Sequence, residues 1–351
     1  MTKPKISVDG NSPLEQGSCR VIAEAGVNHN NSIERAIQMA VEAKKAGAWA
    51  VKYQLYKAGT LAVQNSPKYW TDSLDTSTQF DAFSASDHLD YGQYKEVSEE
   101  CKRIGISFFA TPFDFEAISV LESFDVPLYK IASGDITYKS FLQEIARTGK
   151  PVLLSTGAST KSEVMNAIEW LGGDSSKICP LVCTLTYPTP DADANFARIQ
   201  RFQNELPDFL IGFSDHTIGP EGGWMVAALG GVCIEKHYTL DKTLGLVPDH
   251  AISVDPPELS ELVRACNRGA LMRGNESTEY ADSEGDARSN ARRSLVSIEP
   301  IEVGTPFDLD LVVAKRPGIG IEPWRAESLV GKRFKRRVEA DQTIFDEDLE
   351  K

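Results

Sequence analysis

The sequence of 351 residues predicts a (β/α)8 barrel followed by a small, β-rich C-terminal domain. Eight short apolar runs alternate with segments of helical periodicity as far as about residue 275. No GxGxxG turn follows the first run, which favours a barrel over an open nucleotide-binding sheet. After residue 291 the runs become β-like, with Gly and Pro turns between them. We therefore expect a barrel over 1–274, a linker over 275–290 and a second domain over 291–351.

The apolar runs are the predicted strands of the barrel. In chain order they are Val21–Val27, Ala50–Gln54, Ile106–Ala110, Leu128–Ala132, Val152–Ser155, Ile178–Thr184, Leu210–Phe213 and Val232–Lys236. Short continuous apolar runs are typical of strands that are buried on both faces. Eight such units in a chain of this length favour a closed barrel over a doubly wound sheet.

Apolar stripes with helical spacing lie between these runs, and signals for the start of a helix precede them. Asn31 and Glu34 are spaced as a capping box at the stripe that spans 33–41. Thr160 and Glu163 repeat this device before a later stripe. These signals indicate that the segments between the strands are the outer helices of the barrel.

Three segments depart from this alternation. Lys57–Asp90 is long, polar and without a period, and it follows the second strand, so it would lie over the active-site face as a lid or as a mobile insertion. The acidic stretch 274–290 has the composition of a linker. The last segment, 291–351, is too short for a large core, and we expect it to pack on the barrel or on another subunit.

Composition excludes several classes of protein. The chain carries 51 acidic and 37 basic side chains, a net charge of −14, so it is not expected to bind nucleic acid. No apolar run reaches the roughly 18 residues of a membrane span, and the polar N-terminus lacks a secretory signal. The six cysteines form no CxxC pair, and we expect free thiols in a reducing, cytoplasmic environment.

Side chains able to bind or react stand at the carboxyl ends of all the predicted strands, which is where barrel enzymes carry their active sites. They are Glu24, Lys52, Gln54, Thr111, Lys130, Ser133, Asp135, Ser155, Thr156, Thr184, Tyr187, Ser214, Asp215, His216, Glu235, Lys236 and His237. A lone lysine usually extends to solvent. Lys52 and Lys130 together, beside these hydroxyls, instead predict a pocket for a phosphate and a carboxylate. A Schiff-base lysine is the competing chemical role.

Two of the five histidines end neighbouring strands. His216 and His237 can approach one metal ion from there, and imidazole suits Mn, Fe, Co or Zn. Glu24 is a possible carboxylate partner, or substrate and water supply oxygen ligands. The alternative is that both histidines are structural.

An ordered set of motifs resembles the sialic acid synthase family, and it spans nearly the whole chain. The motifs are VIAEAGVNHNNS, AVKYQLY, FFATPFD, YKIASGDIT, LLSTGAST, CTLTYPTP, GFSDHTIG, IEKHYTLDK and PDHAIS. The tail, with RRSLVSIEPIEVGTPFDLDLVVAKRPGIGI and then LVGKRFKRRVEADQTI, is similar to the antifreeze-like (SAF) domain of the same enzymes. The family condenses phosphoenolpyruvate with an N-acetylated amino-hexose to make nine-carbon sialic, legionaminic or pseudaminic acids.

The resemblance implies a role for each matched residue. Phosphoenolpyruvate would be held by Lys52, Thr111, Lys130, Ser133, Ser155 and Ser214, and the sugar and its reacting end would be contacted by Glu24, Gln54, Tyr187 and Asp249. His216 and His237 would hold a divalent metal, usually manganese, with magnesium or cobalt as alternatives. Arg316 would enter the site of the partner subunit, because the family forms domain-swapped homodimers.

The resemblance thus implies a condensing synthase that releases phosphate by C–O cleavage. Lys52 and Lys130 neutralise the substrate anion, and Asp135 or Glu24 accepts the proton of the attacking water. Three positions depart from the family pattern and leave the identity of the sugar open: Asp135, Leu185 and the tetrapeptide 247–250. The rival functions are a metal-dependent or Schiff-base aldolase on the same barrel and a non-catalytic carbohydrate-binding protein.

Overall fold

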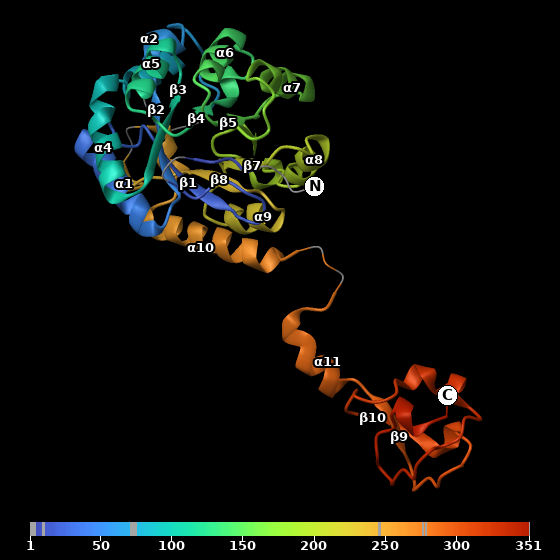
Figure 1. The fold of residues 1–351 in the computed structure, drawn as a ribbon. Helices are drawn as coiled ribbons and strands as arrows, with labels where there is room; N and C mark the ends of the chain where they lie inside the picture. The colour runs from blue at the N-terminus through green and yellow to red at the C-terminus, as the bar shows by residue number, and fades with distance from the viewer. Residues whose placement is uncertain are drawn as a thin grey trace. The chain divides into compact units, whose positions relative to one another are not determined.

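The computed structural model describes residues 5–8, 11–70, 76–244, 247–275, 277 and 279–350. The chain divides into two compact units, Met1–Gly274 and Asn275–Lys351, and each is described by itself. In the first unit the strands lie inside a ring of helices (Figure 1). The predicted barrel with a small C-terminal unit is confirmed.

Eight parallel strands form the barrel wall. They are β1 (Arg20–Gly26), β2 (Ala50–Leu55), β3 (Ser107–Pro112), β4 (Tyr129–Ile131), β5 (Val152–Ser155), β6 (Ile178–Cys183), β7 (Gly212–Asp215) and β8 (Cys233–His237). The hydrogen-bonded order is β3-β2-β1-β8-β7-β6-β5-β4, and β3 and β4, at the two ends of this order, lie in contact. The first strand pairs with the last, as closure of a barrel requires.

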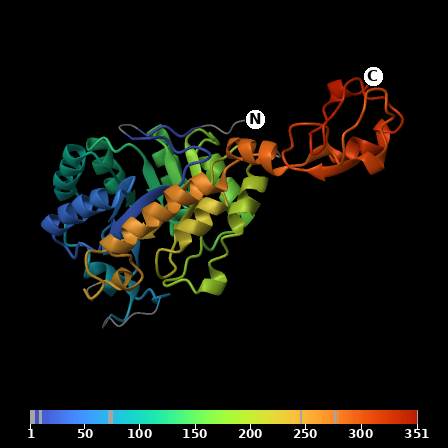
Figure 2. The same cartoon turned by 90° about the horizontal axis from the view of Figure 1, so that it is seen from below.

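The helices of the first unit surround this wall. They are α1 (Ile33–Ala46), α2 (Ala58–Leu61), α3 (Gln79–Ser84), α4 (Tyr94–Ile104), α5 (Phe115–Ser123), α6 (Lys139–Arg147), α7 (Lys161–Trp170), α8 (Arg198–Glu205), α9 (Gly222–Ala228) and α10 (Pro256–Arg273). The long helix α10 runs beside α9 on the outside of the barrel (Figure 2). Among the described residues, no helix is both long enough and apolar enough to cross a membrane.

Helix starts follow their capping residues, with one correction. Thr160 and Glu163 form the predicted capping box of α7. The cap of α1 is Ser32, whose hydroxyl accepts a hydrogen bond from the backbone N–H of Arg35. The prediction of Asn31 as this cap is wrong, because Asn31 has a left-handed backbone with φ 58°, whereas an N-cap residue is extended.

The segment between β2 and α4 contains short helices where the sequence shows no period. Thr78 caps α3 in a capping box with Asp81, and α2 lies in contact with α3. The Lys57 ammonium donates to the carbonyl oxygens of Asp87 and Leu89, 2.6 and 2.8 Å away, and so links the two ends of the segment. Residues 71–75 of this segment lie outside the described residues.

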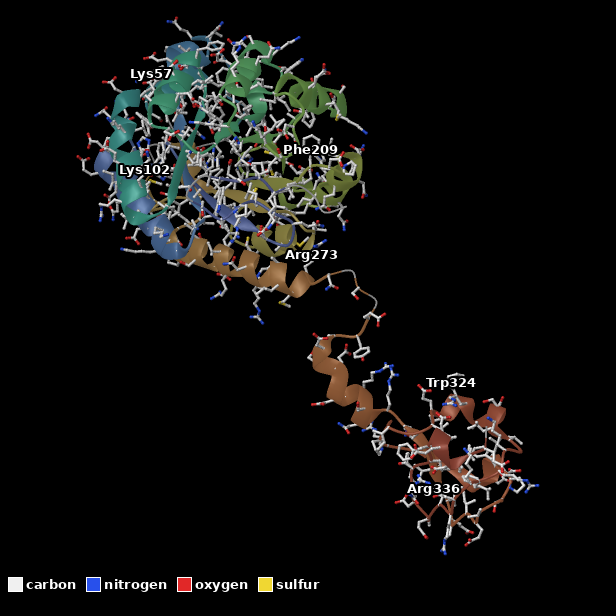
Figure 3. All side chains as sticks on the ribbon, in the orientation of Figure 1. Lys57, Lys102, Phe209, Arg273, Trp324 and Arg336 are labelled. Atoms are coloured by element: carbon white, nitrogen blue, oxygen red, sulfur yellow. The ribbon has the colours of Figure 1, made fainter. Side chains whose placement is uncertain are left out.

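The C-terminal unit has a small core of its own. It contains α11 (Gly285–Ala291) and the antiparallel pair β9 (Ser294–Ser297) and β10 (Val312–Lys315). Its buried apolar residues are Leu295, Ile301, Phe307, Ile321, Leu329, Phe334, Val338, Ile344 and Leu349. Trp324 and Arg336 lie on the surface of this unit (Figure 3).

Candidate active site

A cavity of about 410 Å³ opens at the carboxyl ends of the barrel strands. All the predicted site residues of the barrel line it: Glu24, Lys52, Gln54, Thr111, Lys130, Ser133, Asp135, Ser155, Tyr187, Ser214, His216, His237 and Asp249. The remaining predicted residue, Arg316, directly follows β10 in the other unit and is exposed. The structure therefore brings residues from all eight strands and their loops into one site.

Lys52 is the centre of a buried ionic network at the floor of this cavity. Its ammonium lies 2.9 Å from Glu24 Oε2 and 3.5 Å from Glu235 Oε1, and it donates to Thr111 Oγ1 at 2.8 Å. Gln54 holds the other oxygen of Glu24 at 2.8 Å. Burial lowers the pKa of Lys52, but the charges of Glu235 and Glu24 outweigh this effect and raise that pKa above its ordinary value.

The two carboxylates of the network differ in protonation. Burial raises the pKa of Glu24 to about 7, against the opposing charge of Lys52. Burial also acts to raise the pKa of Glu235, but the positive charges of Lys130 and Lys52 outweigh it and leave that pKa below its usual range. Glu235 is therefore the permanent counter-ion, and Glu24 can exchange a proton near neutral pH.

Lys130, on β4, faces the same counter-ion from the other side. Its ammonium lies 3.5 Å from Glu235 Oε1, and burial lowers its pKa even though Glu235 opposes the shift. Burial raises the pKa of nearby Asp135 to about 6, against the charge of Lys130. Among the described residues, Ser155 Oγ and Asp135 Oδ2 are buried without a hydrogen-bond partner. A buried polar atom without a partner costs free energy, so these atoms point to a missing polar ligand.

The two histidines meet on the opposite side of the cavity. The ring centres of His216 and His237 are 5.5 Å apart. His216 Nδ1 lies 2.9 Å from the carbonyl oxygen of Thr184, which can only accept, so Nδ1 carries the proton and Nε2 keeps a lone pair. His237 Nδ1 lies 3.4 Å from Asp249 Oδ2 and has no hydrogen-bond partner among the described residues. Burial holds the pKa of His237 well below its usual range.

Aromatic side chains form the outer wall of the cavity. Phe113, Tyr56, Phe83, Trp70, Tyr69 and Tyr187 make successive ring contacts in that order, with centres 4.9–6.3 Å apart. Tyr187 then packs on His216 with ring centres 4.2 Å apart. We call these six residues the aromatic arc. They bring the β2–α4 segment against the loop after β6, over the mouth of the site.

The sequence reasoning missed several lining residues and misplaced others. Glu235 stood among the strand-end residues but received no role, although the cavity floor depends on it. Cys183 lines the cavity as well. The described lining does not include Thr156, Thr184, Asp215 and Lys236, although they also stand at strand ends. Successive side chains of a strand point to opposite faces. Lys236 lies between Glu235 and His237, which face the cavity, so it points outward to Asp215.

Comparisons with known proteins identify the family of the chain. The model of the NeuB family matches residues 36–278, and the SAF domain model matches residues 292–350. An N,N'-diacetyllegionaminic acid synthase of Legionella pneumophila is 33% identical, with 95% of each chain covered. An N-acetylneuraminate-9-phosphate synthase of Mus musculus is 31% identical over 95% of this chain and 93% of that one.

A solved structure extends the likeness to the fold. The structure of an N-acetylneuraminic acid synthetase from Leptospira borgpetersenii, in complex with citrate, has a TM-score of 0.73 and is 31% identical. It covers 81% of this chain and 95% of that one. The family match takes in more than half of the chain and includes seven of the eight barrel strands, β2 to β8. The chain therefore belongs to the NeuB family, as its motifs predict.

Proposed function

We propose that the protein is a phosphoenolpyruvate-dependent synthase that makes a nine-carbon, sialic-acid-type sugar from an N-acetylated hexosamine. One observation carries the proposal above all. Two buried lysines, Lys52 and Lys130, share a single permanent counter-ion at the floor of a barrel cavity, beside buried polar atoms without partners. Such a floor suits a small multiply charged anion, to which the two ammonium groups and the unpartnered Ser155 hydroxyl can donate.

Phosphoenolpyruvate occupies this floor in the proposal. Lys52 and Lys130 neutralise its phosphate and carboxylate, and the surrounding hydroxyls of Thr111, Ser133, Ser155 and Ser214 donate hydrogen bonds. Gln54, Tyr187 and Asp249, which also line the cavity, contact the sugar.

The donor set of the histidine pair fits a divalent metal. Each neutral imidazole has one nitrogen lone pair to offer, and among the described residues no group of three or more His, Cys, Asp or Glu side chains is placed to hold a metal, so substrate and water would supply the other ligands. We propose that His216 and His237 hold this ion and that it is manganese, with magnesium or cobalt as alternatives. When bound, the metal serves as a Lewis acid toward the aldehyde of the open-chain sugar.

The proposed reaction balances without a further co-reactant. C3 of phosphoenolpyruvate bonds to the aldehyde carbon, whose oxygen takes up a proton to become a hydroxyl, and water adds to C2. The C2 hydroxyl then loses its proton as the C2 carbonyl forms, and the C2–O bond to the phosphate breaks, so that phosphate leaves with the bridging oxygen. Asp135 or Glu24 accepts the proton of the water, since both carboxyl groups line the cavity and have raised pKa values. Lys52 and Lys130 hold the phosphate as its charge grows.

The C-terminal unit takes part in the proposal through Arg316. This residue lies on a fixed turn, because Ser294 Oγ donates to the carbonyl oxygen of Pro317 at 2.7 Å and the N–H of Gly318 donates to that of Ser289 at 2.7 Å. We propose that the guanidinium contacts the sugar in the site of a partner subunit within a domain-swapped homodimer. The six cysteines are free and buried, which supports a cytoplasmic setting.

A labelled substrate tests the reaction directly. Phosphoenolpyruvate that carries 18O in the bridging position is incubated with a panel of N-acetylated hexosamines, and the released phosphate is analysed by mass spectrometry. We expect the label in the phosphate with at least one acceptor. Phosphate release without the label would contradict C–O cleavage. Condensation without phosphate release, or a borohydride-reducible adduct on Lys52 or Lys130, would instead support the aldolase.

A further inference from the structure

A second polar cleft lies at the amino end of the barrel, where β1 and β2 begin. Its volume is about 210 Å³, and it shares no described lining residue with the active-site cavity. The polar side chains of its lining include Asn11, Ser12, Arg20, Lys44, Trp49 and Asn267. We call this space the basal cleft. It is separate from the carboxyl ends of the strands, where the proposed condensation takes place.

The charged side chains of the basal cleft are cationic. Arg20 and Lys44 line it, and none of its described lining residues is acidic. Glu15 lies outside the lining, where Lys5 forms an ion pair with it and, together with the charge of Arg20, holds its pKa below the usual range. The chain as a whole has 51 acidic and 37 basic side chains, so this cleft is a local excess of positive charge that attracts anions.

Both cations have hydrogen-bond donors to offer to a ligand. Arg20 Nε is buried and has no hydrogen-bond partner among the described residues. Such a buried donor costs free energy until it is paired. The Lys44 ammonium donates to the carbonyl oxygen of Gly105, which also lines the cleft, but an ammonium has three N–H donors. Lys44 can therefore donate to a ligand as well.

The N-terminal segment gives the basal cleft a fixed wall. The side-chain amide of Asn11 donates to the carbonyl oxygen of Trp49 at 2.6 Å and to Ser107 Oγ at 3.0 Å. In return, Trp49 Nε1 donates to the carbonyl oxygen of Ser12 at 2.8 Å. These hydrogen bonds hold residues 11 and 12 against the starts of β2 and β3, so the wall is part of the folded barrel.

We propose that the basal cleft binds a small dianion, whose two negative charges are carried by one phosphate group or by two carboxylates. The guanidinium of Arg20 has a planar fork of donors that matches the oxygens of either group, and Lys44 supplies the second positive charge. One water takes up about 30 Å³ of the liquid, so the cleft has room for an ion of several heavy atoms. This anion site is additional to the floor of the active-site cavity at Lys52 and Lys130.

Trp49 provides a spectroscopic reporter for the basal cleft, because it lines the cleft and is 7% exposed. The five tryptophans of the full chain are replaced by 5-fluorotryptophan, and 19F NMR follows the resonance that Trp49→Phe removes. The protein is titrated with inorganic phosphate and, separately, with malonate. We expect a saturable shift of the Trp49 resonance with at least one of them, and the anion that produces it identifies the ligand as a phosphate or a dicarboxylate. A resonance that does not shift with either anion, or that drifts without saturation, would overturn the proposal.

Variants locate the anion that causes the shift. Arg20→Gln and Lys44→Gln should each weaken its affinity by about tenfold or more, because each removes one charge-assisted contact. Lys45→Gln is the matched control, because Lys45 is the next residue of α1, is paired with Glu42 and lies outside the lining. If Arg20→Gln does not fold, Lys44→Gln provides the test, because Lys44 is exposed.

Phosphate can also bind in the active-site cavity, so a further variant separates the two sites. Lys130→Met changes the floor of that cavity and should leave the affinity measured at Trp49 unchanged. An affinity that falls in Lys130→Met but stays the same in Lys44→Gln would place the anion in the active-site cavity and overturn the proposal.

Discussion

Lys130 is the floor residue whose charge is most available to a ligand. Among the described residues its ammonium lies within 4 Å of one carboxylate, that of Glu235 at 3.5 Å, whereas Lys52 is also paired with Glu24 at 2.9 Å. An anion that enters the floor therefore gains most from Lys130, whose burial leaves it poorly solvated. This difference between the two lysines gives the first prediction.

Lys130→Met keeps the length of the side chain and removes its charge. The KM for phosphoenolpyruvate should rise by about 10- to 150-fold, the equivalent of about 1.5–3 kcal/mol for one charge-assisted contact, and the KM for the sugar should change far less. Steady-state kinetics with each substrate varied in turn measures both values. Lys95→Met, on the surface of α4, is the control. An unchanged KM for phosphoenolpyruvate would remove Lys130 from the anion site.

The pH profile should distinguish the two candidate bases. A base acts in its deprotonated form, so kcat/KM rises with pH through its pKa and then levels off. The pKa is about 6 for Asp135, which faces Lys130, and about 7 for Glu24, which faces Lys52, Lys130 and Glu235. We expect a rise centred near one of these values that is lost in Asp135→Asn or in Glu24→Gln. A rise that persists in both variants would exclude both assignments.

Removal of the metal can be followed by binding as well as by turnover. Dialysis against EDTA should abolish turnover, and Mn²⁺ should restore it. Calorimetry with Mn²⁺ should give at least a tenfold weaker affinity for His216→Ala than for the wild type, since about that much is lost when only the support of a ligand is removed. His88→Ala is the control, because His88 is exposed and outside the cavity lining. Full activity of metal-free His216→Ala would refute the proposed site.

At the residue scale, the sequence predicted which polar side chains stand at the ends of strands. It did not predict which of these side chains contact one another. Polar side chains after apolar runs indicate the site, since parallel strands in a barrel bring their carboxyl ends together. Glu235 was visible in this way, but its position between Lys52 and Lys130 depends on three separate strands. The contact of Trp70 with Phe83 lies in a segment without any period, so no pattern could predict it.

At the scale of the element, β8 combines two different roles in alternate residues. Glu235 and His237 face the cavity, whereas Lys236 points to the helices, where its ammonium lies 3.0 Å from Asp215 Oδ2 and also donates to the carbonyl oxygen of Thr217. This pair is fully buried. Because breaking a buried pair leaves one charge without compensation, the pair matters for stability even though it is outside the site.

Lys236→Met should therefore lower the free energy of unfolding by about 3–5 kcal/mol, because Asp215 is left buried and unpaired. Urea unfolding followed by circular dichroism measures this change. The double variant Lys236→Met/Asp215→Asn should recover part of the loss, since no unpaired charge remains. If Lys236→Met left the unfolding midpoint unchanged, the pair would have no structural role.

The predicted strands were accurate where an apolar run and a hydrogen-bonded ladder coincide. Val152–Ser155 is β5 without any change of bounds. The run that begins at Leu210 becomes β7 only from Gly212, although Leu210 and Ile211 are buried. An apolar run in the sequence indicates that its residues are buried. A strand begins only where its backbone forms hydrogen bonds with a neighbouring strand, and the sequence pattern does not show that position.

At the scale of the whole molecule, the change of pattern near residue 291 indicated a second unit, and the structure gives that unit its own core. The segment 275–290 remains a predicted linker, although α11 occupies part of it from Gly285 onward. A site that is completed by a residue of a second subunit cannot be predicted from the pattern of a single chain. Composition and periodicity describe a single chain. The role of Arg316 in the site of a partner subunit therefore has to be tested with two different chains in one dimer.

Mixed dimers provide this test. Arg316→Ala and Lys52→Ala should each be inactive, because one lacks the guanidinium from the C-terminal unit and the other lacks the centre of the floor network. If Arg316 acts in the partner's site, a dimer that combines the two variants contains one site with both wild-type residues and one site with neither. Co-expression with two different tags, followed by purification on both, should therefore give about half of the wild-type turnover per dimer. Each variant co-expressed with a tagged copy of itself is the control. Purified mixed dimers without activity, when both parents fold normally, would show that Arg316 acts within its own chain or has no part in the reaction.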